Sequence, residues 1–149
     1  MKTISKMYEH LNWANLRILE TIQSIEDENQ DVLRLFSHIL FAEKIWITRL
    51  REMDSSRLPI WSDVDIEVCT ELALQNEESF TTFLTKLEKS DLEKIISYKN
   101  SKGTEFKSSV RDVLTHVALH GQYHRGQINS RLRAEGIEPV NLDFITFVR

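Results

Sequence analysis

The sequence predicts an all-α protein, a four-helix bundle with a short hairpin-like segment before the last helix. Four stretches repeat apolar residues at intervals of three and four, the spacing that places side chains on one face of an α-helix. The 149 residues include only 4 Gly and 2 Pro, so these stretches hold few residues that break helices. A chain of this length suits a single domain, here residues 1–149, in which the four apolar faces pack together.

The first two predicted helices cover residues 3–25 and 29–53. The apolar stripe of the first is Ile4, Met7, Leu11, Ala14, Ile18, Ile22 and Ile25. The stripe of the second is Leu35, Phe36, Ile39, Trp46, Leu50 and Met53. Asp31 is the expected N-cap of the second helix, because aspartate accepts hydrogen bonds from the free amides of a first turn.

Residues 54–66 are predicted to form a loop, because Pro59 lies there among several Asp and Ser residues. Its apolar residues, Leu58, Ile60 and Trp61, are expected to fold back onto the bundle. A third helix follows, with a face of Cys69, Leu72, Asn76, Phe80, Phe83, Leu84 and Leu87.

Between Ile95 and Phe106 the pattern changes to alternating residues on both sides of a turn, which indicates a hairpin. Ser108 or Ser109 then caps a fourth helix that ends at Gly136. Its apolar face is Val110, Val113, Leu114, Val117, Ile128 and Leu132. The tail 142–147 is apolar and is expected to dock on the bundle, and Trp13 and Leu16, outside the stripe of the first helix, indicate a covering tail or a dimer contact.

Composition excludes several classes of protein. The net charge is −4 with basic and acidic residues interspersed, so no basic surface for nucleic acid is expected. No apolar run reaches the roughly 20 residues of a membrane span, and the first residues lack the apolar stretch of a secretory signal, so we expect a cytoplasmic protein. The single cysteine, Cys69, lies among the apolar residues Val68, Leu72 and Ala73 and suits a small core residue at least as well as a nucleophile.

The histidines are the candidate functional residues. Two of them, His120 and His124, lie four residues apart and point into the bundle, within about 60° of the centre of the apolar stripe. Imidazoles at this spacing can converge on one metal ion. His38, at the edge of the apolar face of the second helix, is the best placed third ligand, whereas His10 and His116 lie about 100° from their stripes.

This pattern has two interpretations. Inward histidines are often core residues that form hydrogen bonds, and pairs four apart also arise by chance. Two imidazoles within an apolar stripe nevertheless need partners for their polar nitrogens, and a shared metal ion satisfies both. Three neutral imidazoles would leave a coordination position open, as in catalytic sites.

Several segments, in order along nearly the whole chain, resemble the DinB/YfiT-like family, named for damage-inducible proteins. The most specific is DVLTHVALHGQYHRGQI at 112–128, which contains the element His-Arg-Gly-Gln. The other segments are YEHLNWAN at 8–15, HILFAEKIW at 38–46, Tyr98-Lys-Asn, Gly103, LRAEG at 132–136, Pro139, Asp143 and Phe144.

The resemblance implies a helical bundle whose metal ligands are His38, His120 and His124. It implies a divalent ion, usually zinc or nickel, and often a homodimer. Characterised relatives include transferases and isomerases that use low-molecular-weight thiols such as bacillithiol or mycothiol, so a small-molecule substrate and a thiol co-substrate are expected.

Three functions follow from these expectations. The first is a metal-dependent transferase that adds a small thiol to an electrophile. The second is a metal-dependent hydrolase of a small ester or amide, weakened because no carboxylate is positioned as in His-Glu-x-x-His. The third is a stress-related protein that binds metal without catalysis.

Other polar residues have two possible roles each. Asn15 lies in the apolar stripe of its helix and either contacts a ligand histidine or substrate or forms a hydrogen bond between helices. Glu43 is either a general base or an exposed partner of Lys44 or Arg49. Arg125 and Gln127 either orient the ligand imidazoles or pair on the surface.

Overall fold

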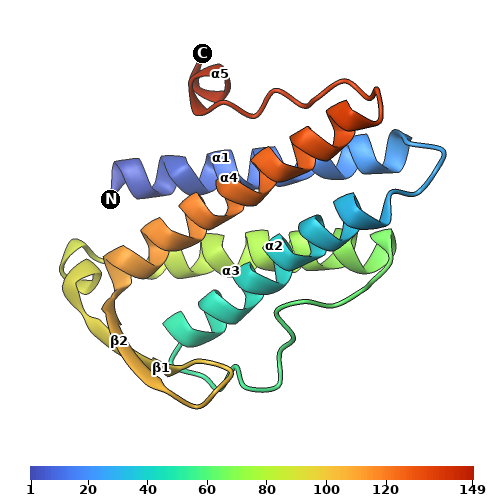
Figure 1. Cartoon of the computed structure of the whole chain (residues 1–149). Helices are drawn as coiled ribbons and strands as arrows, with labels where there is room; N and C mark the ends of the chain where they lie inside the picture. The colour runs from blue at the N-terminus through green and yellow to red at the C-terminus, as the bar shows by residue number, and fades with distance from the viewer.

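The computed structural model describes all 149 residues and has four long helices, as expected. They are α1 (Lys2–Ser24), α2 (Gln30–Leu50), α3 (Ile66–Lys86) and α4 (Val110–Ala134). A short 3₁₀-helix, η1 (Lys89–Glu93), and a short helix, α5 (Phe144–Val148), complete the helical elements. Both helices α1 and α2 pack against α3 and α4, so α1 and α2 lie diagonally across the bundle (Figure 1).

The predicted hairpin is confirmed. Strands β1 (Ile95–Lys99) and β2 (Glu105–Ser109) pair antiparallel, with Ile95 opposite Ser109 and Lys99 opposite Glu105. The hairpin leads directly into α4, whose N-cap Ser109 accepts a hydrogen bond from the Asp112 amide. Figure 1 shows the hairpin at the end of the bundle where α4 begins.

The second helix begins where it was predicted, but its predicted N-cap and its predicted end are wrong. Its N-cap is Asn29, whose side chain accepts a hydrogen bond from the Val32 amide, and Asp31 lies in the first turn. The helix ends at Leu50 because the backbone turns into the left-handed region at Glu52, where φ is 57°. Met53 is therefore outside the helix and 62% exposed rather than part of the apolar stripe.

The core extends along the whole bundle in two clusters. One gathers residues around Phe36, Ile39 and Ile128, and the other residues around Leu11, Phe80 and Leu114. Cys69 is fully buried in the first cluster, as predicted, and burial raises the pKa of its thiol to about 12. None of the helices combines the length and the apolar character that a membrane span requires.

The C-terminal segment returns along α1 and α4. Leu142 is buried, and Phe147 of α5 packs on Trp13 with ring centroids 5.4 Å apart. The expectation of a tail that covers Trp13 is therefore confirmed, whereas Leu16 stays 38% exposed. Figure 1 shows α5 on the outer side of α1.

Candidate metal centre

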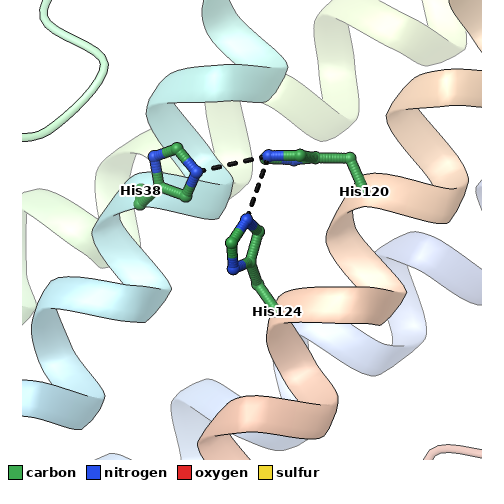
Figure 2. A group of neighbouring side chains, drawn as sticks. All are labelled: His38, His120 and His124. Atoms are coloured by element: carbon green, nitrogen blue, oxygen red, sulfur yellow. Dashed lines mark hydrogen bonds between the residues drawn. The ribbon is translucent and has the colours of Figure 1, made fainter.

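Three histidines from two helices meet between α2 and α4. His38 lies in the third turn of α2, and His120 and His124 lie one turn apart in α4, which packs directly on α2. The Nε2 atom of His120 lies 3.2 Å from that of His38 and 3.1 Å from that of His124. Figure 2 shows the three rings directed at one point from the two helices.

This geometry fits a metal ion. One nitrogen from each ring lies within 4.8 Å of the other two. Imidazole nitrogens bound at 2.0–2.1 Å to a tetrahedral ion are about 3.3 Å apart, close to the two shorter separations. The three residues expected from the sequence are thus brought together and could hold a metal ion.

Hydrogen bonds of the Nδ1 atoms fix the tautomers of two of the three histidines, His38 and His124. His38 Nδ1 lies 2.9 Å from the Ile60 carbonyl oxygen, and His124 Nδ1 lies 2.7 Å from Gln127 Oε1. Carbonyl oxygens only accept hydrogen bonds, so each Nδ1 carries the proton and donates it. The Nε2 atoms of His38 and His124 are then unprotonated and available to a cation, an arrangement typical of metal-binding histidines.

Burial favours neutral imidazoles at this centre. It lowers the pKa of His38, and it lowers the pKa of His120 to about 4, with further contributions from the neighbouring His124 and His38. Neutral imidazole is the form that binds metal.

The loop after α2 covers one side of the centre. The ring of Trp61 stacks on that of His38, with centroids 3.7 Å apart and an angle of 4° between the planes. Together with the hydrogen bond from His38 to the Ile60 carbonyl, this confirms that the loop folds back onto the bundle at Trp61, whereas the Ile60 side chain is 40% exposed. Trp61 is still 43% exposed, so this side of the centre borders solvent.

The two remaining histidines are outside the centre. His116 is exposed, and its ring lies 5.5 Å from that of His120 and 5.2 Å from that of Trp46. His10 is buried on another side of the bundle, where its Nε2 donates to the Leu142 carbonyl oxygen at 2.8 Å. Its role is to anchor the C-terminal segment.

Two of the sequence alternatives for polar residues are wrong. Glu43 is buried and accepts hydrogen bonds from Asn15 and Asn76, so it is not an exposed partner of Lys44 or Arg49. Arg125 is also buried, so it does not pair on the surface. A solvated face was one of the two alternatives for each residue, because charged side chains are rarely buried without partners.

Burial is the largest influence on the pKa values of both Glu43 and Arg125. It raises the pKa of Glu43 to about 7, and the opposing effects of Asn15, Arg125 and Asn76 are smaller. Burial likewise lowers the pKa of Arg125 to about 10, against the effect of Glu43. Asn15 forms the interhelical hydrogen bonds foreseen as one alternative, not a bond to a ligand histidine.

Three groups that contact these side chains were not identified from the sequence: the Ile60 carbonyl and Trp61 at His38, and Asn76 at Glu43. The Ile60 carbonyl leaves no signal in the sequence, because every residue has a backbone carbonyl. Trp61 was expected to pack on the bundle, but its stacking on His38 depends on the path of the loop. Asn76 had a signal, since it is an amide within an apolar stripe, as Asn15 is.

Comparisons with known proteins agree with the resemblance seen in the sequence. The model of the DinB family matches residues 1–149. The chain is also 26% identical to Protein DinB from Bacillus subtilis (strain 168), over 93% of this chain and 90% of that protein. A match along the whole length, on a helical bundle with the expected histidines side by side, shows that the chain belongs to the DinB family.

Proposed function

We propose that the protein binds a divalent metal ion through His38, His120 and His124 and uses it to transfer a low-molecular-weight thiol to a small electrophile. The observation that carries this proposal is the convergence of three Nε2 atoms, two of which have tautomers that leave them free to bind a cation. Zinc or nickel is the proposed ion, since imidazole nitrogen suits both.

Three protein ligands leave a coordination position for a small molecule. A divalent ion supplies a Lewis acid that lowers the pKa of a bound thiol and so favours the nucleophilic thiolate at neutral pH. In the transfer, a sulfur–carbon bond forms, the leaving group departs with its electron pair, and the thiol proton goes to solvent. The three neutral rings would hold the ion, and the exposed side at Trp61 would give the substrates access.

A metal-dependent hydrolase is the alternative, and the position of Glu43 weakens it. That carboxyl group is 2% exposed, and its two oxygens accept hydrogen bonds from Asn15 and Asn76. It is therefore directed at the amides in the bundle interior and is poorly placed to activate water at the histidines. A stress-related protein that binds metal without catalysis is the remaining possibility.

The first experiment tests the site. Purified protein is loaded with zinc or nickel, desalted and assayed for metal, and about one ion per chain is expected. His120→Ala should lose the ion, whereas His116→Ala, one turn earlier on α4 and exposed, should keep it. Full metal content in His120→Ala would contradict the assignment.

The second experiment tests the reaction. The metal-loaded protein is mixed with monobromobimane or chlorodinitrobenzene and a panel of cellular thiols, and product is measured against metal-free protein and His120→Ala. Thiol-dependent turnover only in the loaded protein is expected. Turnover of esters without thiol would favour the hydrolase, and no turnover with either would favour the non-catalytic alternative.

We further propose that the protein works in the cytoplasm, where cellular thiols stay reduced, and that it acts as a homodimer. Size-exclusion chromatography with light scattering tests the second part. A mass of about 35 kDa, twice the 17.5 kDa chain, is expected.

A further inference from the structure

Four buried polar side chains, one from each long helix, meet in the middle of the bundle. They are Asn15 of α1, Glu43 of α2, Asn76 of α3 and Arg125 of α4, each between 1% and 3% exposed. Burying a carboxyl group and a guanidinium is costly, even when they are partnered, compared with apolar residues of the same size. The benefit of such a cluster can instead be a single alignment of the helices.

Hydrogen bonds connect α4 to α2 through Asn15. Arg125 Nη1 donates to Asn15 Oδ1 at 2.7 Å, and Asn15 Nδ2 donates to Glu43 Oε1 at 2.9 Å. The other carboxyl oxygen of Glu43 accepts from Asn76 Nδ2 at 3.2 Å, so Glu43 is held from two sides.

The same two helices carry the three histidines. Arg125 follows His124 in α4, and Glu43 lies on α2 with His38. Consecutive helical residues are about 100° apart around the axis, so Arg125 can be anchored to α1 while His124 faces α2. The Arg125 anchor therefore fixes the rotation of α4 about its own axis.

Gly121 makes this anchor close and rigid. A Cβ atom at position 121 would lie 3.0 Å from Arg125 Nη1 and 3.2 Å from Nη2, so the guanidinium packs directly against the α4 backbone. Loss of the bond to Asn15 would remove this polar restraint on the rotation of α4 and leave only the apolar packing of its buried face. A rotation of about 20° moves a ring nitrogen about 6 Å from the axis by about 2 Å, more than the roughly 0.5 Å that a functional site tolerates.

We propose that Asn15, held between Arg125 and Glu43, is a positioning residue that sets the rotation of α4 relative to α2 and so makes the three Nε2 atoms converge. The proposal rests on the proposed metal site for its functional meaning. Its structural content, the alignment of His38 with His120, can be tested without metal.

The test compares Asn15→Leu, which removes both hydrogen bonds but keeps the branched shape and the number of heavy atoms, with Leu92→Ala. Leu92 is buried in η1, among the residues around Phe80 and Leu114, and its truncation lowers stability without touching the Asn15 bonds. Zinc affinity is measured by competition with a chromophoric chelator, and Co(II) absorption reports the coordination geometry.

Asn15→Leu should bind zinc at least about ten-fold more weakly and change the Co(II) bands, whereas Leu92→Ala should match the wild type in both. Asn15→Leu with wild-type affinity and bands, or Leu92→Ala with an equal loss, would overturn the proposal. If Asn15→Leu does not fold, Asn15→Ala leaves room for water, and a smaller loss of about three-fold is expected.

A second readout separates this proposal from the proposed function. In crystals of metal-free Asn15→Leu or Asn15→Ala, the Nε2 atoms of His38 and His120 should be further apart than 3.2 Å by about 1 Å or more. An unchanged separation would overturn the positioning role. A wild-type protein that binds neither zinc nor Co(II) would instead refute the metal site, and the metal-free crystals would still decide the role of Asn15.

Discussion

At the scale of single residues, the tautomer of His124 depends on a neighbour one turn away. Gln127 accepts the Nδ1 proton at 2.7 Å and so leaves Nε2 unprotonated on the side of His38 and His120. Partners of this kind fix the orientation of metal-binding histidines and raise their basicity. Gln127 thus contacts the His124 imidazole, and its Nε2 also donates to the exposed Tyr123 hydroxyl at 3.5 Å, so contacts of both expected kinds are present.

Replacing Gln127 with leucine should weaken metal binding. The variant removes the acceptor while keeping a side chain of similar size, so zinc affinity is expected to fall about 10- to 100-fold. Competition with a chromophoric chelator at fixed pH measures the dissociation constant. Gln75→Leu, on exposed α3 surface, is the matched control, and equal affinity of the two variants would refute the role of Gln127.

Two glycines of α4 should respond in opposite ways to alanine. At Gly121 an added Cβ would lie 3.0 Å from the buried Arg125 guanidinium, which Asn15 holds in place, whereas at Gly126 nothing lies within 4 Å. Gly121→Ala should therefore cost about 1–3 kcal/mol of overpacking. Gly126→Ala should gain about 0.5–1 kcal/mol, because alanine favours helix.

Urea unfolding of the wild type, Gly121→Ala and Gly126→Ala measures these free energies. If Gly121→Ala were as stable as Gly126→Ala, the guanidinium would have to be free to move, contrary to its buried position. The two substitutions are chemically identical and lie on the same helix, so intrinsic helix propensity cancels in the comparison.

At the scale of elements, the start of α2 shows which residue of a polar run acts as the cap. Asn29 and Asp31 both suit an N-cap, but only Asn29 bonds a free amide, that of Val32, at 3.0 Å. Asp31 lies in the first turn, where its charge interacts only with the helix dipole.

Alanine substitutions should reveal this difference. Asn29→Ala is expected to lower the free energy of unfolding by about 1 kcal/mol, and Asp31→Ala by less than about 0.5 kcal/mol, since the second loses no hydrogen bond. Urea unfolding in low salt measures both. A larger loss in Asp31→Ala would show that Asp31 caps α2 in solution.

The sequence predicts the helical elements well where apolar periodicity is strong. The apolar stripes of the first and fourth helices are at least partly buried throughout, and the hairpin is where alternation indicates it. The end of α2 was missed because its signal is weak: Glu52 adopts a left-handed conformation without a glycine. Met53 continues the apolar spacing, so the pattern alone extends the helix too far.

The candidate site was predictable for a related reason. The positions of His120 and His124 on the helical wheel indicate their direction, and the choice of His38 over His10 follows from its place at the edge of the apolar face of its helix, whereas His10 lies about 100° from its stripe. Periodicity indicates which face is inward but not which polar groups meet there. The pairing of Glu43 with Asn15 and Asn76 therefore appears only in three dimensions.

At the scale of the whole molecule, the protonation of Glu43 links the assembly of all four helices to pH. Burial raises its pKa to about 7 from an ordinary value of 4.5. Between these values the unfolded chain has released the proton and the folded protein retains it, so raising the pH favours unfolding. The stabilisation is complete below about pH 4.5 and is lost by about pH 7.

Glu43→Gln keeps the shape of the side chain and cannot titrate, so it isolates this effect. The free energy of unfolding of the wild type minus that of the variant should fall by about 3 kcal/mol between pH 4.5 and pH 7.5, because the pKa of Glu43 is about 7 in the folded protein and 4.5 in the unfolded chain. The buried histidines, whose lowered pKa values destabilise the fold as the pH falls, are present in both proteins and cancel. Urea unfolding at several pH values gives the curve, and a difference that rises with pH would mean that the attraction of Arg125 outweighs the cost of burying the carboxylate.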